Sequence, residues 1–306
     1  MSGSKRVFFF SLLAVIMVSF TFSPVSAAEK IIHVKGGGGL QLAVREWGNP
    51  DGPAILLIHG WSQNHMCWSQ QYTNEKLAKK YRMVTFDLRG HGDSERPLAP
   101  ENYTNSQLWA DDIAAIIKEM KLKKPVLVGW SYGGAVISDY LRFYGDSAIS
   151  GIDFVDGANK IMQSQGYPMV GPVFLNNAGG MCAPPDLDTN LEATMAFVTG
   201  CSNKPIRQEL FARAIGYNMV VPPQVRGAMV ARDLNNDDVL SKISVPCLIT
   251  QGKADNVILP AMAEYTAKMV PGAKLSLYKD IGHSPFVEDT ARFNSELDAF
   301  VAGCQK

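Results

Sequence analysis

The chain has 306 residues, of which 46% are hydrophobic, and its 29 basic and 29 acidic residues give a formal net charge of zero. This composition allows a large buried core, and the absence of Lys/Arg-rich blocks argues against a nucleic-acid-binding surface. The length beyond the N-terminal segment fits one α/β domain with an insertion, or two small domains.

The first 28 residues have the pattern of a secretory signal peptide. Lys5 and Arg6 form a charged start, residues 7–22 are an almost unbroken apolar run, and the small residues Ala27 and Ala28 follow. An uncleaved membrane anchor is the competing interpretation, but the run is slightly short for a span and the small-residue site favours cleavage. We therefore expect cleavage after Ala27 or Ala28, export to the periplasm or medium, and no stable membrane anchoring afterwards.

Short apolar runs alternate with helical patterns along most of the remaining chain. The expected strands are 31–34, 40–47, 54–58, 83–86, 126–128, 152–155, 247–250 and 275–278, and the expected helices are 68–80, 106–120, 134–144, 260–270 and 288–301. Continuous apolar runs such as 54–58 are typical of strands that are buried on both faces. The alternation predicts an α/β fold with a doubly wound, mostly parallel sheet.

One stretch, residues 159–238, interrupts this alternation. It has no convincing strand, and helical patterns cover 187–199, 206–217 and 224–233. We interpret it as a helical cap inserted into an α/β core formed by residues 29–158 and 239–306. The cap contains six methionines, which either line an adaptable apolar pocket or fill the cap's own core.

The five cysteines are Cys67, Cys182, Cys201, Cys247 and Cys304. They form no C-x-x-C pair, so we expect no zinc site. Export permits disulfides, and Cys182 and Cys201, which flank one helical segment, are the best candidate pair. Cys247 lies in an apolar run and is expected to be a small buried hydrophobic residue.

The sequence Gly129-Trp130-Ser131-Tyr132-Gly133 is the strongest motif in the chain. It reads G-x-S-x-G and lies between an expected strand and an expected helix, which is the context of a nucleophile elbow. A chance glycine-serine turn is the alternative, and the flanking strand and helix argue against it. We therefore predict that Ser131 is a catalytic nucleophile.

A serine needs a base and an acid to become a nucleophile. His283 follows the 275–278 strand, and Asp255 follows the 247–250 strand, so both belong to the ligand-binding edge of an open parallel sheet. We predict that His283 is the base and Asp255 its acid, with Asp153 and Asp156 as alternative acids. Activity is then expected to fall as His283 becomes protonated.

Two backbone N–H groups are expected to form the oxyanion hole. Tyr132 directly follows the serine, and Trp61 lies in the glycine-containing loop after the 54–58 strand. His59, in the same loop, could serve as a second base, but we expect it to have a structural role.

Together these residues resemble the α/β-hydrolase superfamily, over nearly the whole chain from Ile31 to Val301. The resemblance rests on the G-x-S-x-G elbow, on His59-Gly60-Trp61, on the segment 86–94 with its Asp-x-Arg-Gly-x-Gly-x-Ser pattern, and on the loops holding Asp255 and His283. Within the superfamily the chain looks like the small capped serine esterases, including those called non-haem haloperoxidases or perhydrolases. The resemblance implies that Asp87, Arg89 and His91 are scaffold residues. Tyr132 departs from the methionine that many relatives carry.

The sequence predicts a serine hydrolase that cleaves a small ester or lactone through an acyl-enzyme, with no cofactor and no metal. C–C bond hydrolysis, acyl transfer or peracid formation by the same triad remain alternatives, and so does a ligand-sensing receptor on a hydrolase scaffold. Dehalogenases and epoxide hydrolases of this fold attack with an aspartate, whereas Ser131 holds that position here.

Overall fold

The computed structural model describes residues 30–162, 165 and 167–305, and the described residues from Ile31 onward form one compact unit. The signal peptide expected at 1–28 lies outside the described residues. Within the described part of the chain, no helix has both the length and the apolar character needed to cross a membrane.

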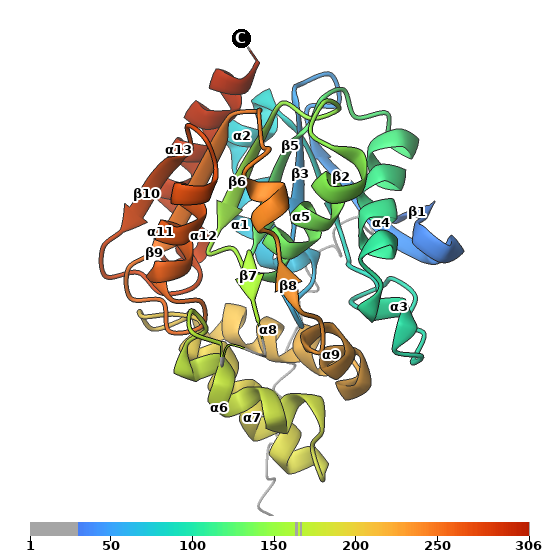
Figure 1. Ribbon diagram of the computed structural model, residues 1–306, viewed down its shortest axis with the longest axis vertical. Helices are drawn as coiled ribbons and strands as arrows, with labels where there is room; N and C mark the ends of the chain where they lie inside the picture. The colour runs from blue at the N-terminus through green and yellow to red at the C-terminus, as the bar shows by residue number, and fades with distance from the viewer. Residues whose placement is uncertain (1–29, 163–164, 166, 306) are drawn as a thin grey trace, which may run out of the picture. The chain divides into compact units, whose positions relative to one another are not determined.

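An eight-stranded sheet forms the centre of the fold (Figure 1). Its strands, in spatial order, are β1 (Ile32–Lys35), β2 (Gln41–Gly48), β4 (Arg82–Phe86), β3 (Ala54–Ile58), β5 (Val126–Trp130), β6 (Gly151–Val155), β9 (Cys247–Gly252) and β10 (Lys274–Tyr278). Only β2 runs antiparallel to its neighbours, β1 and β4, and every other pairing is parallel. The predicted mostly parallel sheet is therefore confirmed.

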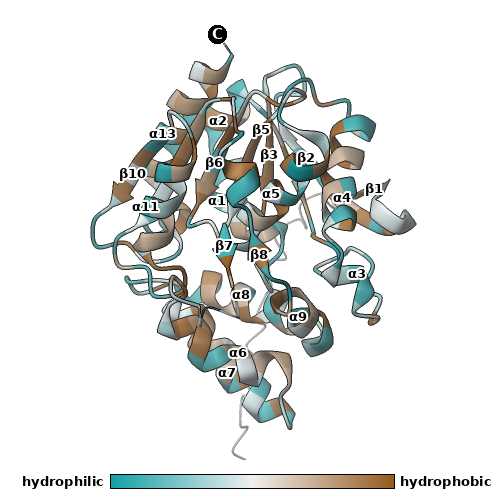
Figure 2. Cartoon of the chain, viewed as in Figure 1, coloured by the Kyte–Doolittle hydropathy of each residue, from teal (hydrophilic) through white to brown (hydrophobic). Residues whose placement is uncertain are grey.

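Helices cover both faces of this sheet. Those that form or flank the α/β layers are η1 (Gly37–Gly39), η2 (His65–Trp68), α1 (Ser69–Tyr72), α2 (Glu75–Lys80), α3 (Glu101–Thr104), α4 (Ser106–Glu119), α5 (Tyr132–Tyr144), α10 (Asp237–Leu240), α11 (Pro260–Met269), α12 (Pro285–Glu288) and α13 (Thr290–Cys304). Alternate residues of one strand belong to two separate cores. Leu56 and Ile58 of β3 belong to the core that includes residues of α4, α5 and α11, whereas Ile55 and Leu57 belong to the core that includes residues of α1, α2 and α13. Both faces of the strand are buried, which explains its continuous apolar run, and Figure 2 shows the hydrophobic residues gathered along the central strands.

The insertion between β6 and β9 is mainly helical and lies at the end of the sheet near β7 and β8 (Figure 1). It contains α6 (Pro172–Cys182), α7 (Leu187–Gly200), α8 (Gln208–Val220) and α9 (Pro223–Val230). The expectation that it contains no strand is wrong, because β7 (Lys160–Ile161) and β8 (Leu234–Asn235) pair as a two-stranded antiparallel ribbon at its two ends. Strands of two residues carry too little periodicity to be found in a sequence. The division into core and cap stays a prediction.

The continuous helix expected at 68–80 is also wrong. The structure divides this segment into η2, α1 and α2, and the new start at α2 is capped by Asn74, whose side chain accepts a hydrogen bond from the Leu77 N–H. Asparagine favours such a cap because its side-chain oxygen satisfies an otherwise unpaired backbone donor.

The five cysteines are all free thiols in the structure, so the candidate pair Cys182 and Cys201 does not form a disulfide. The two residues face different neighbours: Cys182 packs beside Gly227 of α9, whereas Cys201 is buried and lines a cavity together with Trp130 and Phe286. Cys247 is buried, as expected.

Candidate active site

Ser131 occupies a sharp turn between β5 and α5. Its backbone angles, φ 54° and ψ −118°, lie in a region that non-glycine residues rarely adopt. A Cβ on Gly133 would lie 2.6 Å from the Ile58 carbonyl oxygen, and one on Gly129 would lie 2.7 Å from the Gly133 carbonyl oxygen. The two glycines of the motif are therefore required by close packing of strand against helix, and the turn leaves the Ser131 side chain at the border of a cavity.

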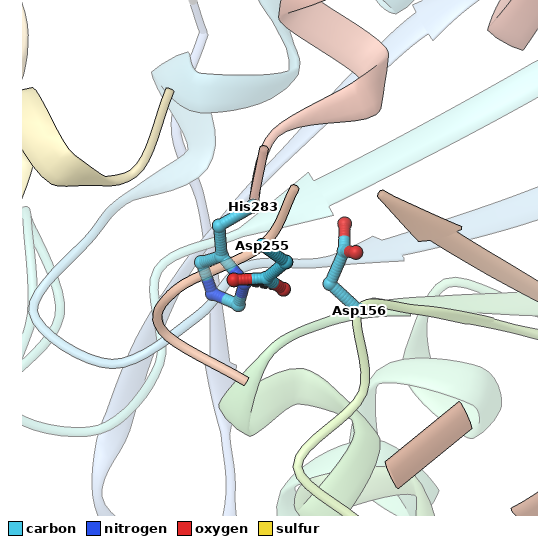
Figure 3. A group of neighbouring side chains, drawn as sticks. All are labelled: Asp156, Asp255 and His283. Atoms are coloured by element: carbon cyan, nitrogen blue, oxygen red, sulfur yellow. Dashed lines mark hydrogen bonds and ion pairs between the residues drawn. The ribbon is translucent and has the colours of Figure 1, made fainter. Parts of the chain in front are cut away.

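His283 and Asp255 are hydrogen-bonded in the buried interior, 2.7 Å apart from Nδ1 to Oδ2 (Figure 3). Asp255 also accepts hydrogen bonds from the backbone N–H groups of Val257 (2.7 Å) and Ile258 (3.1 Å), and from Gln251 Nε2 (3.1 Å). These donors stabilise the carboxylate. Since His283 Nδ1 donates to Asp255, Nε2 is the imidazole nitrogen able to accept a proton.

The loop carrying His283 is fixed by two residues that the sequence did not single out for this role. Trp130, which precedes Ser131, donates from Nε1 to the His283 carbonyl oxygen at 2.7 Å, and its ring lies 5.4 Å from the imidazole, centroid to centroid. Glu288 accepts a hydrogen bond from the Gly282 N–H at 2.8 Å. The strand that carries Ser131 is thereby tied directly to the loop of His283. Nothing in the local sequence indicates these partners, because they are distant along the chain.

The loop after β3 lies against Ser131. A Cβ on Gly60 would lie 3.0 Å from the Ser131 Cβ, so glycine permits this close approach. Within the described residues, neither the Trp61 nor the Tyr132 backbone N–H donates a hydrogen bond. Of the two predicted oxyanion donors, Tyr132 follows Ser131 in the chain, and Trp61 lies near it in space, next to Gly60 and in the lining of the same cavity.

Two histidines hold this loop on either side of Trp61. His59 donates from Nδ1 to the Gly60 carbonyl oxygen (2.8 Å), and its Nε2 accepts from the Leu88 N–H (2.9 Å). His91 Nε2 accepts from the N–H of Ser62 (3.1 Å), whose φ of 62° is also in the left-handed region. Burial lowers the pKa of His59 to about 4 and that of His91 to about 3, so both rings are neutral and can accept these bonds.

Tyr132 is held from the insertion side. Its hydroxyl donates to the Met229 carbonyl oxygen at 3.2 Å and accepts from Arg232 Nη1 at 2.9 Å. The same arginine forms a buried ion pair with Asp139 of α5, at 2.6 Å. The polar end of Tyr132 is therefore satisfied, and burial raises its pKa to about 12.

Two cavities flank the segment Trp130–Ser131. The Ser131 cavity is mainly apolar and aromatic, and its lining includes Ser131, Trp61, Tyr132, Phe174, Phe197, Met229 and Arg232. The Trp130 cavity lies beside the His283 loop, and its lining includes Trp130, Ser284, Phe286, Cys67, Cys201 and Tyr217. Of the six insertion methionines considered in the sequence, Met229 lines the Ser131 cavity, while Met181 is part of the hydrophobic core.

Asp156, Asp255 and His283 form the one cluster of possible metal ligands among the described residues, with one ligand atom of each within 4.8 Å of the others. The four N–H donors around Asp255 suit a carboxylate that is stabilised by hydrogen bonds. The sequence-based expectation of no metal and no cofactor stays a prediction. The other alternative acid, Asp153, bonds Thr250 instead, at 3.0 Å.

Comparison with known proteins identifies relatives over most of the chain. A sequence profile described as "Alpha/beta hydrolase family" matches residues 55–296. The chain is 26% identical over 258 residues to a pimeloyl-[acyl-carrier protein] methyl ester esterase of Aliivibrio fischeri, covering 82% of this chain and 94% of that protein. Among solved structures, a putative aryl esterase from Burkholderia cenocepacia is 35% identical with a TM-score of 0.82, covering 90% of this chain and 99% of that one. Esterase RhEst1 from Rhodococcus sp. ECU1013 is 31% identical with a TM-score of 0.83, covering 89% and 98%.

Proposed function

The chain belongs to the alpha/beta hydrolase family and is an esterase-type hydrolase, and we propose that it cleaves small esters with neutral, apolar acyl groups through an acyl-enzyme on Ser131. The observation that carries this proposal is the buried Asp255–His283 hydrogen bond beside a strained serine turn. The three residues come from three separate loops and match the order and roles of a Ser-Asp-His triad.

In the proposed reaction, His283 Nε2 takes the Ser131 hydroxyl proton as Oγ attacks the ester carbonyl carbon. Asp255 holds the Nδ1–H tautomer and stabilises the imidazolium that forms. The tetrahedral intermediate collapses to the acyl-enzyme as the imidazolium gives its proton to the departing alkoxide. Water, deprotonated by His283, then attacks the acyl carbon and releases the carboxylic acid, and the proton returns to Ser131.

The negative charge on the tetrahedral oxygen is proposed to be stabilised by the backbone N–H groups of Trp61 and Tyr132. Their positions beside Ser131 support this role, and so does the fixing of residues 60–62 by His59 and His91. A fixed donor stabilises the developing charge without having to reorganise during the reaction.

The lining of the two cavities supports the substrate class. The Ser131 cavity contains both proposed oxyanion residues, so we assign it to the acyl group, and the Trp130 cavity, beside Ser284, to the leaving alcohol. Arg232 is the cation at the Ser131 cavity, and it is already paired with Asp139. Burying a substrate carboxylate there would therefore lack a free counter-ion.

A panel of p-nitrophenyl and methyl esters tests the proposal. Neutral short-chain and aryl acyl esters are expected to be cleaved with a kcat/KM at least about tenfold above that of half-esters of dicarboxylic acids, because the latter bring an unpaired charge into the cavity. Lactones and peracid formation with hydrogen peroxide, measured on the same enzyme, report the alternative uses of the acyl-enzyme. Absence of turnover on every ester would contradict the proposed function.

We also propose that the protein is exported and cleaved after Ala27 or Ala28, on the pattern of residues 1–28. Intact-mass measurement of the protein from the periplasmic or extracellular fraction of an expressing bacterium is expected to give a chain that begins at Ala28 or Glu29. A full-length chain retained in the membrane fraction would instead support an uncleaved anchor.

A further inference from the structure

Asp156 is a buried acid that the proposed mechanism does not use, although it lies in the same cluster as Asp255 and His283 (Figure 3). It directly follows β6, and its φ of 44° is in the left-handed region. Two hydrogen bonds tie it to β9: its N–H donates to the Thr250 carbonyl oxygen (2.8 Å), and its Oδ1 accepts from the Gly252 N–H (2.8 Å). Both bonds hold the carboxyl group in place beside Asp255.

The second oxygen of this carboxyl group is the unusual feature. Oδ2 of Asp156 is buried and has no hydrogen-bond partner among the described residues, if the group is taken as a carboxylate. A buried carboxylate oxygen without a donor is costly, whereas a protonated oxygen needs only an acceptor. Asp255 is the candidate acceptor: the two carboxyl groups belong to one cluster whose ligand atoms lie within 4.8 Å of one another, and a hydrogen bond between the two side chains is among the causes that raise the pKa of Asp156.

The two carboxyl groups compete for one negative charge. Asp255 receives four hydrogen bonds, from the backbone N–H groups of Val257 and Ile258, from the Gln251 side chain and from His283, whereas Asp156 receives one. When two buried carboxyl groups lie within about 4.8 Å, ionising both is strongly unfavourable, so one of them stays protonated. Asp156, which has fewer hydrogen-bond donors, is the group that holds the proton. The other ionisable groups near Asp156 are Glu288 and Cys201, neither of which is a cation.

We propose that Asp156 is a positioning residue that holds a proton and presents its O–H to the carboxylate of Asp255. The proposal rests on the triad proposed above. The O–H stabilises the carboxylate of Asp255 and limits the basicity of the Asp255–His283 pair. In agreement with this role, burial and the neighbouring Asp255 charge raise the pKa of Asp156 well above its ordinary value.

Three variants test the proposal through the pH–rate profile for a p-nitrophenyl ester. Asp156→Asn keeps a donor and an acceptor, so kcat/KM is expected to stay within about threefold of wild type with an unmoved acid limb. Asp156→Ala removes the donor, so kcat/KM is expected to fall about 10- to 100-fold, as for other supporting residues, with an acid limb at higher pH because Asp255 becomes more basic. Asp153→Asn is the matched control, because it makes the same change at a buried aspartate of β6, three residues before Asp156, that bonds Thr250. It is expected to leave the profile unchanged.

Infrared difference spectroscopy, wild type minus Asp156→Asn, shows whether the Asp156 carboxyl group is protonated, which a purely structural role does not require. At pH 8, with ¹³C-aspartate label, the expected difference is the carbonyl band of a protonated carboxylic acid. Carboxylate bands in this difference spectrum would overturn the proposal. An acid limb that moves to lower pH in a folded Asp156→Asn variant would also overturn it, because that shift is expected when an ionised carboxylate, which stabilises the imidazolium, is removed. Retention of wild-type turnover by Asp255→Asn would instead contradict the triad, and absence of wild-type turnover would contradict the function.

Discussion

Asp153 and Asp156 are three residues apart at the end of β6 and have different environments. Asp153 accepts a hydrogen bond from the Thr250 hydroxyl at 3.0 Å, and burial raises its pKa to about 8. The sequence kept both as alternatives to Asp255 because all three follow or end expected strands. The structure places the His283 hydrogen bond on Asp255, which is a matter of loop geometry that no spacing rule determines.

Asp153 is expected to make the stability of the protein depend on pH. Its pKa is raised from 3.8 to about 8, so between these values the folded chain holds a proton that the unfolded chain has lost. Its contribution to stability is therefore present below about pH 4 and is lost as the pH rises toward 8. Asp153→Asn is expected to become progressively more stable relative to wild type over this range, by up to several kcal/mol. Urea unfolding of both proteins at pH 4.5 and 8 measures the difference, and an equal difference at the two pH values would contradict the raised pKa.

Residues with a local motif could be proposed for the site from the sequence, and residues defined only by distant partners could not. Ser131 carries its G-x-S-x-G context with it, and His283 and Asp255 follow recognisable strands. Trp130, Glu288 and the proton-holding role of Asp156 depend on contacts between segments far apart in the chain.

At the scale of elements, the insertion is joined to the sheet layer by a buried ion pair. Arg232 lies between α9 and β8 and pairs with Asp139 of α5 at 2.6 Å. It also bonds Ser106 of α4 at 2.9 Å and the Tyr132 hydroxyl. One side chain thus links the insertion to α4, to α5 and to a proposed oxyanion residue.

Arg232→Met is expected to lower the free energy of unfolding by about 3–5 kcal/mol, because it leaves the buried Asp139 without its partner. The double variant Arg232→Met/Asp139→Leu is expected to recover part of this loss, since it leaves no unpaired charge. Urea unfolding curves of the two variants and wild type give the comparison. Equal stability of Arg232→Met and wild type would show that the ion pair does not stabilise the junction.

Strong periodicity made the larger elements predictable. The apolar run of β3 gave its bounds without error, and the patterns of α4, α7 and α11 placed these helices within about two residues. The sequence missed α6, whose glycines and asparagines weaken its helical pattern, and it missed β7 and β8, which form only as a pair.

For the molecule as a whole, the similarity that identifies the family and the fold extends over most of the chain, whereas substrate specificity is expected to depend on the two cavities. Relatives at 31% and 35% identity share the sheet and its helices, with TM-scores of 0.83 and 0.82. The Ser131 cavity is lined in part by residues of the insertion, such as Phe174, Phe197 and Met229. The family therefore indicates the chemistry, and the insertion is expected to select the acyl group.

Ser131 is proposed to form a covalent acyl-enzyme, and peptide mass spectrometry after reaction with a fluorophosphonate shows whether this serine is the nucleophile. We expect one label per chain at neutral pH, located on Ser131, and no label in Ser131→Ala. Ester turnover is expected to fall by at least about 10⁴-fold in that variant. An unlabelled wild-type enzyme that still hydrolyses esters, or a label on a residue other than Ser131, would contradict this proposal.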